Sequence, residues 1–434
     1  MLDGRGRRVF PRNQQEIWNV LAADAQYHLV RAALGPLDTS RDLTLWPFDQ
    51  RSIWNLSIGQ LAQYVFAGIR HPTAASFFAD SDIFTLTPSA PSTTVFVNTD
   101  DWGGGSRCGV QGGSLFSAPI PTNFVVPGAN SGSPDGSTPN ACAAFLAADG
   151  HTIIQTQPFA RCVAGQPPTS HYLFGQEDLF GLGETGSHGG SALSALGGTI
   201  RLGELVPPGY GGYGIGVIRH AMKLNIDEIN FYPGFSGYRW PARKSDAGGA
   251  GYGGSIPECR MGSLLALRPD FNIAGLESEP GKILARGLMD YGAYNCDSAG
   301  WSAFGIPTER SPAGNVIDEF QAAWKFPLNA SPGQNGWARD CDKIATSLYV
   351  VNNWDFPSWQ VISATGGLQG VGGGTPRQPW ADQIVVPPPP PPGPPPPPPP
   401  PVPQIDPFLI AGAAVLAVGT AVVGLSLANP PRRA

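Results

Sequence analysis

Charged residues are scarce in this chain: Asp, Glu, Lys and Arg make up 14% of its 434 residues, against roughly 25% in ordinary soluble domains. Long amphipathic helices are therefore disfavoured, because they need such residues on their solvent-exposed face. The densest basic cluster is only Arg5, Arg7 and Arg8, and the net charge is −6. The chain lacks the basic patch of a nucleic-acid surface, so we expect no nucleic-acid partner.

Several motifs of known chemistry are also missing. The six cysteines include no CxxC pair, which argues against a zinc site. The glycine-rich stretch 181–220 contains no GxxxxGK[ST] or GxGxxG loop that follows a strand and opens a long helix, so a phosphate loop is not predicted. No GxSxG nucleophile elbow occurs either. We expect no metal site and no cofactor.

Glycine and proline are abundant instead, with 57 and 46 residues. They favour short strands joined by tight turns, whereas an aromatic content of 10% argues against disorder in the main body. These features predict a mainly β fold, resembling a β-sandwich or jelly roll with Gly-rich loops and a few short helices. The glycines of 181–220 are expected to allow tight turns and close backbone approach.

Local patterns predict the domain organisation. Residues 1–80 are expected to form a helical segment packed on the body, with a short helix at 57–69, and 81–380 to form the β-rich globular domain. The Asp-Gly pair at 149–150 predicts a hairpin between strands near 143–147 and 152–157. Helices are expected at 280–291 and 315–325. Strands are expected at 218–226, at 263–267 and around Tyr294.

The even number of cysteines permits three disulfides, with free buried thiols as the alternative. The segment around Cys108 and Cys142 is loop-rich and would gain most from a covalent link. We therefore expect at least one disulfide, without assigning its pairing.

Residues 387–401 are fourteen prolines interrupted only by Gly393. Such a run adopts polyproline II, so 381–405 is predicted to be a stalk that extends at about 3.1 Å per residue. Residues 408–428 carry no charge and are long enough for a transmembrane helix within 406–429, followed by a short basic tail at 430–434. Small residues spaced by four along this span permit helix–helix self-association.

Arg432 and Arg433 follow the span, which predicts a cytoplasmic C-terminus and a domain on the outer surface of a cell or virion. Glycosylation sequons at Asn55 and Asn329 agree with that side. The first residues lack a signal-peptide pattern, which leaves a cytosol-facing domain open. In that topology the proline tract would recruit partner modules.

Five segments stand out between about 150 and 300: DGHTIIQTQP at 149–158, HGGSALSALGGTIRLGEL at 188–205, RHAMKL at 219–224, YRWPAR at 238–243 and LARGLMDYGAY at 284–294. Together they resemble a group of largely uncharacterised, secreted or surface-associated proteins with no established activity. The resemblance covers roughly a third of the chain. In similar proteins an acidic pair follows the tyrosine-rich segment, whereas this chain has Asn295, Cys296 and Asp297.

One set of residues in or beside Gly-rich turns can perform acid–base chemistry on glycans, which requires two carboxylates or a base beside a cationic group. The alternative is that these residues stabilise loops. For His220, which lies in a strand pattern, an inward side chain would favour a structural role. The candidate catalytic residues are His188, Arg201, Glu204, His220 and Asp246, and the candidate ligand-binding residues are Tyr210, Tyr238, Arg239, Trp240 and Tyr252.

Three functions remain open. The leading hypothesis is a membrane-anchored surface protein that displays a binding or structural domain, with glycans as its expected ligands. The second is a membrane-anchored glycan-cleaving hydrolase or lyase. The third is a cytosol-facing, tail-anchored scaffold.

Overall fold

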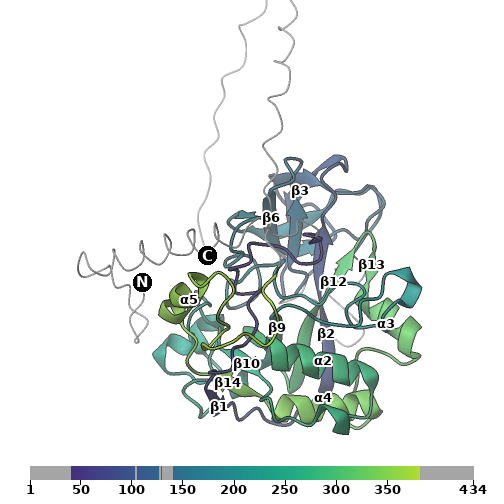
Figure 1. Ribbon diagram of the computed structural model, residues 1–434. Coiled ribbons are helices and arrows are strands. Elements are labelled where there is room, and N and C mark those ends of the chain that lie inside the picture. The colour runs from purple at the N-terminus through teal and green to yellow at the C-terminus, as the bar shows by residue number, and fades with distance from the viewer. Residues whose placement is uncertain (1–40, 103–104, 127–128, 130–139, 382–434) are drawn as a thin grey trace, which may run out of the picture. The chain divides into compact units, whose positions relative to one another are not determined.

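The computed structural model describes residues 41–102, 105–126, 129 and 140–381 (Figure 1). By its contacts the chain divides into two units, Met1–Pro387 and Pro388–Ala434, and every described residue belongs to the first. The predicted stalk, transmembrane helix and basic tail, and the helical pattern before residue 41, lie outside the described residues. Within the described part, no helix has the length and apolarity needed to cross a bilayer.

The described residues are mainly β, as predicted, with few helices. The strands are β1 Tyr64–Phe66, β2 Ala75–Thr85, β3 Ser92–Val97, β4 Ser114–Pro119, β5 Ala143–Leu146, β6 Thr152–Ala160, β7 Thr169–Leu173, β8 Glu177–Asp178, β9 Met222–Asp227, β10 Leu264–Ala266, β11 Ala293–Ala299, β12 Ala303–Ser311, β13 Gly314–Asn315 and β14 Tyr349–Val351. The helices are α2 Glu279–Asp290, α3 Val316–Trp324, α4 Gly336–Thr346 and α5 Phe356–Ser363. Short 3₁₀ turns are η1 Tyr210–Gly212, η2 Glu228–Asn230, η3 Phe235–Gly237, η4 Asp246–Gly249 and η5 Ile273–Gly275.

These strands form one mixed sheet in the order β1-β14-β10-β11-β9-β12-β2-β5-β6-β7-β3-β4, with β13 beside β12 and β8 beside β6. The central strand β2 is parallel to both β12 and β5, and β9 is parallel to β11. A jelly roll consists of two antiparallel sheets. The described strand pairing therefore differs from the sandwich or jelly-roll arrangement expected from the sequence.

Both faces of the sheet centre are covered. On one face, α2 and α4 pack together against the strands (Figure 1) and contribute Leu284, Leu288, Trp337 and Ile344 to the largest apolar cluster. On the other face, the Gly-rich stretch contributes Leu193 and other apolar residues to a second cluster. Central strands covered on both sides lose the simple alternation of apolar and polar residues, which is why their arrangement was not visible in the sequence.

Helix α2 confirms the helix predicted at 280–291 and has the expected local causes. Ser278 caps its start by accepting a hydrogen bond from the Gly281 amide, and Pro280 occupies the first turn. Gly292 then ends the helix with φ at +77°. The hairpin β5–β6 around Gly150 and helix α3 are likewise confirmed.

The helix predicted at 57–69 is wrong. This stretch forms isolated bridges to residues near 371–376 and then strand β1, which pairs with β14. Pairing with distant residues overrides the local helical pattern here. Helix α4 was not predicted from the sequence.

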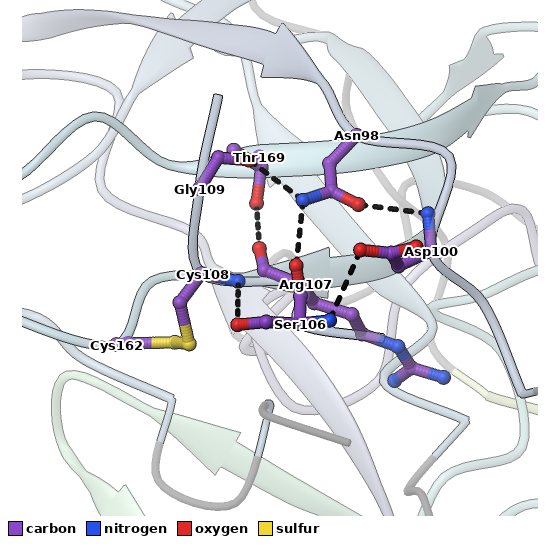
Figure 2. Close-up of a disulfide and its surroundings, with 8 residues drawn as sticks. All are labelled: Asn98, Asp100, Ser106, Arg107, Cys108, Gly109, Cys162 and Thr169. Atoms are coloured by element: carbon purple, nitrogen blue, oxygen red, sulfur yellow. Dashed lines mark hydrogen bonds between the residues drawn. A yellow bond between two sulfur atoms is a disulfide. The ribbon is translucent and has the colours of Figure 1, made fainter. Parts of the chain in front are cut away.

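The predicted disulfide is confirmed as Cys108–Cys162, which joins the β3–β4 loop to the segment after β6 (Figure 2). Around it, Asn98 donates hydrogen bonds to the backbone carbonyls of Ser106 and Gly109, and Thr169 donates to that of Arg107. The remaining cysteines are free and buried: Cys142, Cys259, Cys296 and Cys341.

We predict that the Cys108→Ser/Cys162→Ser variant unfolds with about 2–4 kcal/mol less stability than the wild type, because the bond closes a loop across 54 positions. Urea denaturation with and without reductant measures this loss. Reductant should weaken the wild type and leave the double variant unchanged. Equal stability of the oxidised and reduced wild type would contradict the prediction.

Candidate functional site

Residues 183–203 of the Gly-rich stretch lie directly on the sheet, and the glycines there permit that contact. A Cβ at Gly183 would lie 2.4 Å from the Phe48 ring, and one at Gly186 would lie 1.9 Å from a side-chain oxygen of Gln155. Both distances are too short for any real Cβ contact. The expectation that these glycines allow close backbone approach is confirmed.

A buried ion pair attaches this stretch to the sheet. Asp82 of β2 contacts Lys223 Nζ of β9 at 2.7 Å and accepts a 2.6 Å hydrogen bond from the Thr199 hydroxyl. His188 Nε2 lies 3.3 Å from the other oxygen of Asp82, and all of these side chains are fully or almost fully buried. Burial acts to raise the pKa of Asp82, but Lys223 and His188 hold it below its usual value.

Beside this pair lies a second group of carboxylates, which we call the acid cluster: Asp80 of β2, Asp297 of β11 and Asp246 of η4. The Asn140 amide nitrogen contacts Asp80 at 2.9 Å and Asp297 at 3.0 Å. Asn225 of β9 also donates to Asp80, at 2.8 Å. The two strand carboxylates are thus held close together by amide groups rather than by a cation.

Asp246 completes the acid cluster from the surface side. It is half-buried, its carboxylate accepts a 2.7 Å hydrogen bond from the Ser298 hydroxyl, and its backbone N–H donates to the Tyr252 hydroxyl at 3.2 Å. The Gly190 amide donates to the Asp297 carboxylate at 3.0 Å. The Gly-rich stretch therefore touches the acid cluster as well as the ion pair.

Two carboxyl groups of the acid cluster have raised pKa values. Burial, together with the adjoining Asp246 carboxyl to which it is hydrogen-bonded, raises the pKa of Asp297 well above its usual range. Burial and the charge of Asp82 also raise the pKa of Asp80. Asp297 therefore binds its proton more tightly than an ordinary aspartic acid does, and it lies beside the half-buried Asp246, an arrangement suited to acid–base chemistry.

The structure separates the five predicted catalytic residues. Arg201, Glu204 and His220 belong to another buried network, in which Glu204 contacts His220 Nε2 at 3.0 Å and accepts from the Arg201 amide at 2.8 Å. Arg201 Nε pairs with Glu309 at 2.7 Å. Of the five, only Asp246 lies in the acid cluster. His188 contacts Asp82 of the buried ion pair instead.

The position of His220 favours a structural role over a catalytic one. Its side chain points inward, is 4% exposed, and also contacts the Ala221 carbonyl at 3.0 Å through Nδ1. Burial acts to lower the pKa of His220, but Glu204 raises it overall. The inward orientation that favours a structural role is the one observed.

The sequence analysis missed Asp80, Asn140 and Asn225, and left the role of Asp297 in doubt. One signal was present: Asp80 and Asp82 alternate inside a largely buried strand, so both point to the same covered face. Buried carboxyl groups need hydrogen-bond or ionic partners. Two of them in one strand therefore indicate either a functional site or a network of such partners.

The predicted ligand-binding aromatics also separate. Tyr252 packs on Phe231 with ring centroids 5.0 Å apart and borders the acid cluster, whereas Tyr210 lies beside Tyr213 in a surface loop. Tyr238 packs against the α2 side of the sheet. Trp240 joins Trp354, Phe356 and Trp359, and the neighbouring Arg239 donates to the Trp354 carbonyl at 2.8 Å.

The two glycosylation candidates differ in access. Asn55 is 2% exposed, and its amide nitrogen donates to the carbonyls of Pro47 and Asp49, so it cannot carry a glycan in this fold. Asn329 is exposed, and its side-chain oxygen accepts from the Ala79 amide.

The described residues contain no group of three or more His, Cys, Asp or Glu side chains arranged to hold a metal ion. A cavity of about 300 Å³ lies beside the disulfide, lined in part by Val110, Val163 and Pro167. None of the predicted site residues lines it.

Comparison of the chain with known family models, curated proteins and solved structures found no match.

We predict that Gly190→Ala lowers stability by about 1–3 kcal/mol, because the added methyl group would lie 2.6 Å from the Asp246 carboxyl carbon. Gly175→Ala is the matched control, since a Cβ there meets nothing within 4 Å. Urea denaturation of both variants measures the difference. Equal stabilities would show that the Gly-rich stretch does not rest on the acid cluster.

Proposed function

We propose that this chain is a hydrolase that cleaves glycosidic bonds with the acid cluster as its catalytic centre. The observation that carries the proposal is the contact between Asp297, whose pKa is raised by burial and by its neighbour, and the half-buried Asp246. Glycoside hydrolysis uses one protonated carboxyl and one carboxylate that flank the scissile bond about 5–10 Å apart, so in the proposed reaction the sugar enters between Asp297 and Asp246 and breaks their hydrogen bond. No cation forms a salt bridge with any of the three acids within the described residues.

In the proposed reaction, Asp297 donates its proton to the oxygen of the leaving sugar as the glycosidic C–O bond breaks. Asp246 accepts a proton from a water molecule, whose oxygen bonds to the anomeric carbon. Each turnover thus consumes one water and yields two hydroxyl-terminated sugars. After the products leave, Asp246 gives its proton to solvent and Asp297 takes one up from solvent, and Asp80 positions Asp297 through Asn140.

We predict that Asp297→Asn and Asp246→Asn each lower kcat about 10²–10⁴-fold in the full-length protein, the usual loss for a missing general acid or base. Release of reducing ends from a panel of polysaccharides measures cleavage. Asp270→Asn is the matched control, because Asp270 is exposed and pairs only with Arg268 on the surface.

The pH dependence has a defined direction. Because the pKa of Asp297 is raised, the donor stays protonated well above the usual range of an aspartic acid, and the rate falls only as pH rises through that raised value. Unchanged cleavage by both Asn variants would place the catalytic centre elsewhere. A wild type that cleaves none of the polysaccharides would overturn the proposal.

A non-catalytic display domain is the second candidate function. It is favoured by the burial of His188, Arg201, Glu204 and His220 in ion-pair networks and by the position of the cavity beside the disulfide. Under this alternative, the acid cluster would serve only to connect the Gly-rich stretch to the sheet.

The proposed setting is a membrane surface, with the domain outside the cytoplasm and the 408–428 segment as the anchor; a cytosol-facing topology is the alternative. We predict that the full-length protein sediments with membranes and needs detergent for extraction, whereas a chain ending at residue 405 stays in the aqueous fraction. Carbonate washing of the membranes distinguishes an inserted helix from peripheral attachment. Recovery of the full-length protein in the aqueous fraction would contradict this prediction.

A further inference from the structure

Three aromatic rings gather at the surface beside α5, and we call them the aromatic platform: Trp240, Phe356 and Trp359. Phe356 and Trp359 are nearly parallel, with centroids 5.6 Å apart and an interplanar angle of 20°. Trp240 lies at their edge, 6.0 Å from Phe356 and 6.4 Å from Trp359. All three side chains are half-buried, so each retains an accessible surface.

The platform is held in place before any ligand arrives. A capping box between Asp355 and Ser358 fixes the start of α5, and the Trp359 indole N–H donates to the Arg51 carbonyl at 2.9 Å. Trp240 rests on Trp354, whose indole N–H donates to the Tyr294 hydroxyl at 2.8 Å. Rings fixed in this way lose little conformational entropy on binding.

The platform also has polar groups at its edge. Within the described residues, no hydrogen bond takes up the Trp240 indole N–H, which therefore reaches solvent. Asp355 is exposed at the start of α5. Accessible aromatic rings bordered by hydrogen-bonding groups match a pyranose ring, which presents C–H groups on its face and hydroxyls at its rim.

The chain connects the platform to the acid cluster. Trp240 precedes Asp246 by six positions, a span of at most about 20 Å of extended chain. Both lie on the face of the sheet covered by the Gly-rich stretch: Trp240 packs on the cluster that contains Leu193, and Asp246 adjoins Gly190. A polysaccharide chain seated on the rings has a short path to the carboxyl groups.

We infer that the aromatic platform is a carbohydrate subsite that stacks a pyranose ring of a polysaccharide chain. The inference names the substrate class of the proposed hydrolase and rests on that proposal for cleavage, though not for binding. It adds Phe356 and Trp359 to the site and keeps Trp240 as a ligand-binding residue, as predicted from the sequence.

The test uses the full-length protein in detergent and titrates it with hexasaccharides of β-1,4-linked glucose, N-acetylglucosamine, xylose and mannose. Binding is followed by calorimetry. The expected result is binding of at least one hexasaccharide, weakened about tenfold by Trp359→Ala and by Phe356→Ala, and largely kept by Trp359→Phe. Trp301→Ala is the matched control, because Trp301 is 44% exposed and packs on Phe78 instead.

Urea denaturation of each variant identifies any loss that is due to misfolding, and the two alanine variants provide independent evidence. The Asp297→Asn variant separates the two proposals, because it should bind the hexasaccharide without cleaving it. If Asp297→Asn cleaves normally while Trp359→Ala loses binding, the hydrolase proposal fails and the subsite stands. If no hexasaccharide binds the wild type, or if both alanine variants bind as tightly as the wild type, the subsite is overturned.

Discussion

The described fold depends on one buried ion pair, between Asp82 of β2 and Lys223 of β9. Moving two charges out of water costs several kcal/mol per ion, and the cost is offset by their mutual attraction together with further hydrogen bonds. Lys223 also donates to the carbonyls of Ser194 and Ala195, and Asp82 accepts from Thr199. These partners all come from the Gly-rich stretch, so the pair connects that stretch to the sheet as firmly as it connects the two strands.

The acid cluster is a consequence of that connection. Because the ion pair draws the backbone of the Gly-rich stretch onto the sheet, the Gly190 amide comes within hydrogen-bonding distance of Asp297, and its missing side chain leaves room for Asp246. The glycines cost conformational entropy on folding, which the fold tolerates because any larger residue would separate these groups. The same glycines therefore contribute both to packing and to the chemistry of the candidate site.

The sequence predicted those features that arise from neighbouring residues. Gly150 in its turn, Ser278 and Pro280 at the start of α2, and the loop-rich surroundings of Cys108 each carry a local signal, and the corresponding elements are present. The strand order and the acid cluster were not predictable in this way. Asp80 and Asp297 are linked because the sheet places only β9 and β12 between β2 and β11 and Asn140 contacts both carboxylates, and no local pattern encodes proximity across more than 200 positions.

The contrast between Asp82 and the acid cluster argues for function rather than for stability alone. Asp82 has a lysine, a histidine and a hydroxyl group around it and is held ionised, as a structural carboxylate should be. Asp80 and Asp297 accept hydrogen bonds from amides and form no salt bridge within the described residues, and their pKa values are raised. A fold that needed only a connection at this point would gain more from apolar residues of similar size. Retaining a protonated carboxyl beside the half-buried Asp246 is costly for stability, and acid–base catalysis is the chemistry that such a pair can supply.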